Sequence, residues 1–250
     1  TTADYNVGIG ISALGANTTG ANNISIGVNS LVSNTTGAQN VAVGSFALDA
    51  NTTADNNTAV GYNALTANTT GAGNVALGAS AGNGITTGSN NIAIGKNAIN
   101  STSTGDNNTA VGNAALNVVS SGGSNVAVGV SALVANTTGS SNVAVGAYAL
   151  DANTTASDNA AIGDNALGAN TTGGNNVAIG SDTLLVNNAS HNTAVGVTAL
   201  TANTTGASNT AVGRDTLKSN TTGAYNTAVG VNALDAATTA SNNTAIGYGA

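Results

Sequence analysis

Apolar and polar positions along this chain recur with a period of 17 residues. The repeat reads N-[VT]-A-[VI]-G-x-x-A-L-x-A-N-T-T-G-x-x, and we number its positions 1 to 17. Fourteen full repeats and a fifteenth partial one begin at Asn6, Asn23, Asn40, Asn57, Asn74, Asn91, Asn108, Asn125, Asn142, Asn159, Asn176, Asn192, Asn209, Asn226 and Asn243. Every step is 17 residues except the step from Asn176 to Asn192, which is 16. Self-similarity at a fixed short period indicates a repeat architecture.

The residue types in the repeat predict short strands separated by turns. Position 4 is aliphatic and position 5 is Gly in every repeat, while position 9 is Leu in all but two of fourteen, where Gly82 and Ile99 replace it. A helical hairpin repeat needs about 34 residues, whereas β-branched residues at positions 2 and 4 favour strands. We therefore predict an all-β fold, a parallel β-solenoid of about fifteen 17-residue coils. Residues 1–250 would form a single repeat domain, cut from a longer chain and without helix.

Each coil is predicted to hold two strands, at positions 1–4 and about 7–11, with turns near position 5 and at 12–17. Successive strand residues point to opposite sides, so position 3, which is Ala in thirteen of fifteen repeats, opposes positions 2 and 4. Neither side is strongly polar, which is typical of strands covered on both faces. We expect positions 3, 4 and 9 to be buried, as Ala59, Val60 and Leu65 illustrate. Outside the thin coil, the simplest covering partner is another copy, which predicts a homo-oligomer with a trimer favoured.

Three polar features of the repeat have structural interpretations. The Gly at position 5 suits a bend with positive φ or a close backbone approach. The Asn at position 1 is expected to stack from coil to coil as a hydrogen-bonded ladder. Asn-Thr-Thr at positions 12–14, complete in nine repeats, predicts a turn in which Asn tolerates left-handed backbone and Thr forms a ladder. These triplets also match the N-glycosylation pattern, which is the alternative interpretation.

The one short repeat, 176–191, has lost a residue after its second strand segment. We therefore expect a shorter turn at 187–191, just before Asn192. If that turn had the usual length, the alignment of the repeats would be wrong.

Composition and charge limit the possible partners. Charged residues are 5% of the 250, and ten Asp against three Lys or Arg give a formal net charge of −7. Such a surface has no basic footprint for nucleic acid or for anionic membrane. No apolar run approaches the roughly 18 residues of a membrane span. Apolar residues make up 41% of the chain and recur at fixed positions of the repeat, a regularity that is not expected of disordered low-complexity chains.

The sequence offers few residues for catalysis or metal binding. Its single His191 has no Cys or Glu to act with and is interpreted as a loop residue in the short repeat. The Asp residues occupy variable positions, and Asp49, Asp151 and Asp235, which share position 10, are five or more repeats apart. A metal ion needs several oxygens around it, so solvated surface charge is the better interpretation. We therefore predict no enzyme, and no catalytic, cofactor or metal residues.

The aromatic residues are too scattered to define one site, although each could stack on a sugar or on a neighbouring chain. They are Tyr5, Phe46, Tyr62, Tyr148, Tyr225 and Tyr248.

The motif N-x-A-[VI]-G-x-x-A-L resembles the head repeats of YadA-type trimeric autotransporter adhesins. The stretches NTAVGYNALTANTTG (57–71) and NTAIGYGA (243–250) resemble repeats of phage tail fibres and of large bacterial surface proteins. The resemblance covers the whole of residues 1–250, although the repeat is longer than the adhesin's and this segment is expected to lie apart from any neck or membrane anchor. It implies a trimer of left-handed parallel β-rolls that serves as a surface-exposed binding head or stalk.

These observations predict a structural and adhesive section of an extracellular fibre on a bacterial surface or a virion. A stiff rod would carry a receptor-binding end toward a host-surface receptor or glycan. One alternative is a self-assembling extracellular filament subunit. Another is ice binding by Thr rows at positions 13 and 14, although adjacent residues point to opposite sides and only one row could belong to a flat array.

Overall fold

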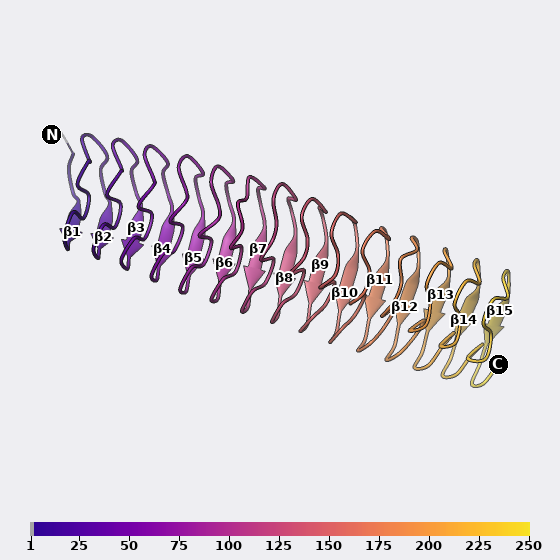
Figure 1. Cartoon of the computed structure of the whole chain (residues 1–250). Helices are drawn as coiled ribbons and strands as arrows, with labels where there is room; N and C mark the ends of the chain where they lie inside the picture. Colours follow the sequence, from indigo (N-terminus) through magenta and orange to yellow (C-terminus); the bar gives the residue numbers. More distant parts are fainter. Residues whose placement is uncertain (1–2) are drawn as a thin grey trace. The chain divides into compact units, whose positions relative to one another are not determined.

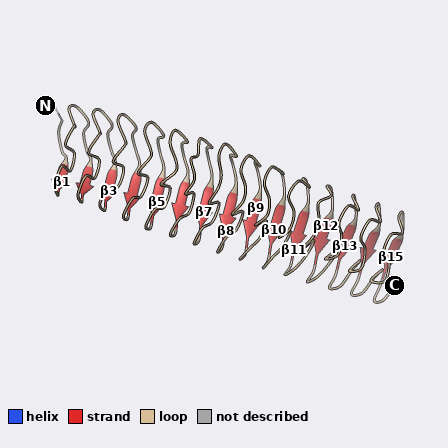
Figure 2. Cartoon of the chain, viewed as in Figure 1, coloured by secondary structure: helices blue, strands red, loops and turns tan. Residues whose placement is uncertain are grey.

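The computed structural model describes residues 3–250, and within them every regular element is a strand (Figure 2). The chain is a parallel β-solenoid of about 14 turns, with one three-residue strand in each repeat. The strands are β1 Val7–Ile9, β2 Ile24–Ile26, β3 Val41–Val43, β4 Thr58–Val60, β5 Val75–Leu77, β6 Ile92–Ile94, β7 Thr109–Val111, β8 Val126–Val128, β9 Val143–Val145, β10 Ala160–Ile162, β11 Val177–Ile179, β12 Thr193–Val195, β13 Thr210–Val212, β14 Thr227–Val229 and β15 Thr244–Ile246. The prediction of an all-β parallel solenoid without helix is confirmed.

The chain divides into two compact units, Thr1–Asn125 and Val126–Ala250. In the first, β1 to β7 pair in chain order, and in the second β8 to β15 do the same (Figure 1). All described pairs are parallel, and the register matches the repeat, as when Val41 lies opposite Thr58. The same repeat position therefore stacks on itself from coil to coil within each unit.

The side chains of each strand alternate between two faces, as expected, but only the central residue lies on the buried face. In β4 the central Ala59 is fully buried, while Thr58 and Val60 are half-buried. The prediction for position 3 is confirmed, and the prediction that position 4 is buried is wrong. Positions 2 and 4 share the outward side, because neighbouring strand residues point to opposite faces. Ala64 at position 8 lines the interior instead, together with the buried Leu65 at position 9.

The predicted second strand at positions 7–11 is a turn. Asn63 and Leu65 have φ values of 55° and 51°, and the same two positions carry positive φ in the other coils. Left-handed residues interrupt an extended strand, so separate backbone hydrogen bonds and not a continuous strand pairing link neighbouring coils in this segment. One example is the Leu65 N–H, which donates to the Ala81 carbonyl at 3.0 Å.

Glycine at position 5 satisfies both expected requirements. Gly61 has a φ of 138°, and a Cβ on it would lie 2.4 Å from the Gly78 carbonyl oxygen in the next coil. No L-residue fits such a site without displacement of the backbone.

The ladder at position 1 is confirmed, and its hydrogen bonds close each coil as well as joining coils. The backbone N–H of Asn57 donates to Oδ1 of Asn40 at 2.9 Å. Nδ2 of Asn57 donates to the carbonyl of Gly71 at 2.9 Å, which ties the start of the coil to its last turn. Because Asn57 is fully buried, these bonds replace the water that the amide has lost.

The short repeat has a shorter turn where the alignment placed it. Nδ2 of Asn187 donates to the carbonyl two residues on, at Ala189, whereas Asn203 reaches Gly206 three residues on. The ladder continues, since the Asn192 N–H still donates to Oδ1 of Asn176 at 2.9 Å. The missing residue is therefore position 14, and the prediction is confirmed.

Candidate interaction surfaces

The outward side of the strands forms an accessible apolar surface. We call it the strand face and define it as the first and third residues of every strand, which are repeat positions 2 and 4. Of these thirty residues, 23 are Val, Ile or Leu, six are Thr and one is Ala. None is buried, and Leu77 in β5 exposes 49% of its surface. Contiguous exposed apolar surface of this kind commonly marks an interaction site.

The strand face carries no charge. All thirteen charged residues occupy positions 6, 7, 10, 16 and 17, in the turns that follow or precede the strand. Three of them, Lys96, Asp164 and Arg214, lie at position 6 near the edge of the face. The face therefore presents apolar side chains and Thr hydroxyls, with no charged group of its own.

The two threonine positions of the last turn behave differently. At position 13 the hydroxyl of Thr35 donates to the backbone carbonyl of Thr52 in the next coil at 3.0 Å, and this bond recurs along both compact units. The Thr ladder exists, but its hydroxyls bond mostly to backbone carbonyls and not to another Thr, and the hydroxyl of Thr171 donates to Oδ1 of Asn188. At position 14, which we call the turn row, Thr36 and its counterparts are exposed. One row of hydroxyls therefore faces solvent.

The asparagine at position 12 forms a second buried ladder, which the sequence interpretation missed. Nδ2 of Asn51 donates to Oδ1 of Asn34 at 2.9 Å and to the carbonyl of Ala54 at 3.1 Å. The backbone at this position is not left-handed, contrary to expectation. The signal was present in the sequence, since this Asn keeps a fixed offset of 11 residues from the Asn of position 1. An N-linked sugar would require this buried nitrogen, so the folded coil does not accommodate one.

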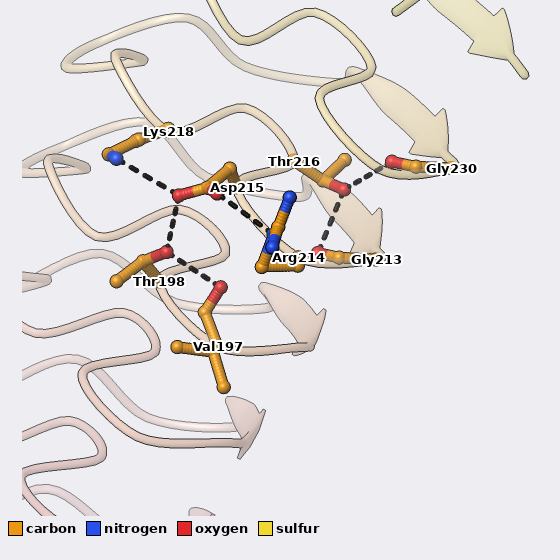
Figure 3. A network of polar contacts seen from close by, with 8 residues as sticks. All are labelled: Val197, Thr198, Gly213, Arg214, Asp215, Thr216, Lys218 and Gly230. Atoms are coloured by element: carbon orange, nitrogen blue, oxygen red, sulfur yellow. Dashed lines mark hydrogen bonds and ion pairs between the residues drawn. The ribbon is translucent and has the colours of Figure 1, made fainter. Parts of the chain in front are cut away.

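A small charged cluster lies at the turn after β13 (Figure 3). Asp215 contacts Nε of Arg214 at 3.2 Å and Nζ of Lys218 at 2.9 Å. The hydroxyl of Thr198 donates to Oδ1 of Asp215 at 2.7 Å, and this hydrogen bond, followed by that of Lys218, lowers the pKa of Asp215. Because the two cations and the hydroxyl already bond to Asp215, the cluster links neighbouring coils and is not a vacant site.

The histidine and aspartates considered for catalysis or metal binding do not come together into one site. His191 is exposed in the short turn with a φ of 64°. Asp235 is exposed, but Asp49 and Asp151 are half-buried, so they are not simply solvated charges. Asp49 accepts a hydrogen bond from Thr66 at 2.7 Å, and burial raises the pKa of Asp151. Residues 3–250 hold no group of three or more metal-ligating side chains and enclose no pocket.

Two aromatic residues from neighbouring coils meet. The rings of Phe46 and Tyr62 lie edge to face with their centroids 6.1 Å apart, and Tyr62 remains 56% exposed. The pair links the turns that follow β3 and β4.

No protein-family model, curated protein or solved structure matches the chain. In the described part of the chain, no helix has the length and apolarity needed to cross a membrane.

Proposed function

We propose that this chain is a structural and adhesive section of an extracellular fibre, on a bacterial cell surface or a virion tail. The observation that carries the proposal is the strand face: an uncharged, exposed apolar surface repeated in every coil, in a chain whose described residues enclose no pocket. Such a molecule acts through its extended surface and its repeated backbone pairing, not through one reactive site. Its task would be to hold a receptor-binding or glycan-binding end away from its carrier.

The working form of the fibre is a homo-oligomer, with a trimer of left-handed coils favoured by the resemblance to YadA-type heads. Association would cover apolar surface that a lone coil leaves in water, and the favourable free energy grows with the area covered. A self-assembling filament subunit is the alternative, and the identical pairing geometry of successive coils favours it.

Immunogold labelling of the source cells or virions with antibody against this chain tests the proposal. We expect gold along projecting fibres. Label confined to the cytoplasm would contradict it, and label on free filaments would favour the alternative.

Ice binding has less support among these functions. Most hydroxyls at position 13 donate to backbone carbonyls of the next coil, whereas the turn row presents its hydroxyls to solvent. A thermal hysteresis assay at micromolar protein would detect the activity if it existed.

A further inference from the structure

We infer that the strand face is a self-association surface, and that its partner is the strand face of a second copy of this chain. This inference rests on the proposed homo-oligomer and adds the surface that forms it.

The chemistry of the face excludes most other partners. Position 2 is Val, Ile, Thr or Ala, position 4 is Val, Ile or Leu, and all charges lie in the turns. A polyanion or an anionic membrane would need cations on this face. A small ligand would need a concave site with convergent polar groups, and none is enclosed by residues 3–250.

The spacing of the face selects the partner. Its two apolar rows recur once per coil because strands such as β3 and β4 pair residue for residue. Neighbouring strands lie roughly 4.7–4.9 Å apart. A partner that fills the gaps between these side chains must carry apolar side chains at the same spacing over the same length. A second copy of the chain has the same apolar side chains at the same spacing.

The area of the face in each compact unit is a substantial part of what a specific contact buries. A three-residue strand is about 10 Å long, so seven coils of the first compact unit offer roughly 340 Å² and eight coils of the second roughly 380 Å². Each unit by itself therefore offers nearly half of the ~800 Å² per partner of a standard specific interface. Packing of one strand face on another also resembles ordinary sheet-on-sheet packing, in which the inner faces are apolar.

The threonines on the face are compatible with this partner. The last four coils carry Thr193, Thr210, Thr227 and Thr244 at position 2. Their hydroxyls would lie against an equally polar row if both copies run in the same direction. Thr–Thr contacts across a sheet are favourable, whereas a hydroxyl buried without a partner is costly.

Two matched quadruple variants test the surface in the full chain. The face variant places alternating charges on the strand face. Each new cation lies beside a new anion, so that neighbouring coils of one chain do not repel each other. Its substitutions are Ile26→Lys, Val43→Glu, Val60→Lys and Leu77→Glu. The control variant places the same charges in the same order on the exposed turn row. Its substitutions are Thr36→Lys, Thr53→Glu, Thr70→Lys and Thr87→Glu.

Sedimentation velocity at low micromolar concentration is the measurement, with circular dichroism to confirm folding. We expect the wild type and the control variant to sediment as oligomers and the face variant as a 23.5 kDa monomer. Assembly of the face variant like the wild type would overturn the inference while the proposed homo-oligomer stands. A wild-type monomer of 23.5 kDa would overturn both.

A milder variant decides the matter if the charged face variant does not fold. It replaces the same four side chains with Thr, a residue that the face already accommodates at position 2. We expect the concentration for half-assembly to rise at least tenfold. An unchanged concentration would overturn the inference.

Discussion

Gly82 and Ile85 are a compensating pair, and restoring the consensus at both positions provides a sharp test of how the coil interior is packed. Gly82 replaces the usual Leu of position 9, and Ile85 replaces the usual Asn of position 12 in the same coil. Ile85 is fully buried. A Cβ on Gly82 would lie 3.3 Å from Cδ1 of Ile85 and 2.9 Å from Cδ2 of Leu65. The isoleucine therefore occupies the space that a leucine fills in other coils.

Each single change should destabilise the chain. Gly82→Leu overpacks the site against Ile85 and Leu65, which typically costs about 1–3 kcal/mol. Ile85→Asn removes a buried aliphatic side chain beside a glycine, and comparable truncations cost about 2–5 kcal/mol. Part of that loss is recovered, because Oδ1 of Asn68 is buried without a hydrogen-bond partner and a new amide would donate to it. Satisfying such a group contributes about 1–3 kcal/mol.

The double variant should be about as stable as the wild type or more stable, because the leucine fills the space and the amide extends the ladder. The φ of 61° at Gly82 is close to the φ of 51° at Leu65, so the backbone already suits a leucine. Guanidinium unfolding of the four proteins, followed by circular dichroism, gives the coupling free energy. We expect it to favour the double variant by about 2 kcal/mol or more, within the range for residues in contact. Additive single effects would refute the compensation.

Single residues at three other places in the coil provide further tests. Gly61→Ala should lower the free energy of unfolding by about 3 kcal/mol because of its φ and the close Gly78 carbonyl. The matched change Gly8→Ala, whose Cβ would meet only ordinary contacts, should be neutral or raise it by about 0.4–1 kcal/mol; equal losses in chemical denaturation would contradict this. Asp151→Asn should raise the melting temperature at pH 7, because burial raises the pKa of Asp151 and disfavours its ionised form. This difference should disappear as the pH falls below the unfolded value of about 3.9, where both states are protonated, and a difference that persists at pH 3 would exclude the cause given. Peptides containing Asn51, Asn68 or Asn153 from native material should have their unmodified masses, since each amide is buried and donates to the last turn; a glycan on any of them would contradict the described burial.

The 17-residue period predicted the fold class, because it fixes which residues of successive coils lie next to each other. The roles of Gly61 and Asn57 followed from residue type, since a fixed Gly demands unusual backbone and a fixed Asn demands hydrogen-bond partners. The turn at positions 6–11 could not be predicted in the same way. Leucine disfavours left-handed backbone, so Leu65 reads as a strand residue, and only its neighbours in three dimensions impose a φ of 51°.

The sequence predicted that one apolar side of the strand faces outward, but it did not predict which repeat positions form that side. Neither side of a stretch such as Thr58–Val60 is strongly polar, so the sequence alone does not reveal which side faces the interior. The structure resolves this through size: the narrow interior takes the small Ala59, and the larger Val60 lies outside. The Asn51 ladder was missed because Asn-Thr-Thr matches two common patterns, a turn and a glycosylation signal, and both suggested exposure.

The backbone explains why this protein needs many coils. Positions 7, 9 and 17 are left-handed in nearly every coil, usually without glycine, at a cost of roughly 1–2 kcal/mol per residue. One coil cannot offset that cost alone, because Asn57 finds its acceptor in the preceding coil and Leu65 donates to the following one. Each coil is therefore stabilised mainly by its neighbours, as in other quasi-one-dimensional repeat proteins. The hydrogen bonds between neighbouring coils also fix the spacing of the side chains on the strand face. The contacts that stabilise the fold therefore set the spacing that a second copy would have to match.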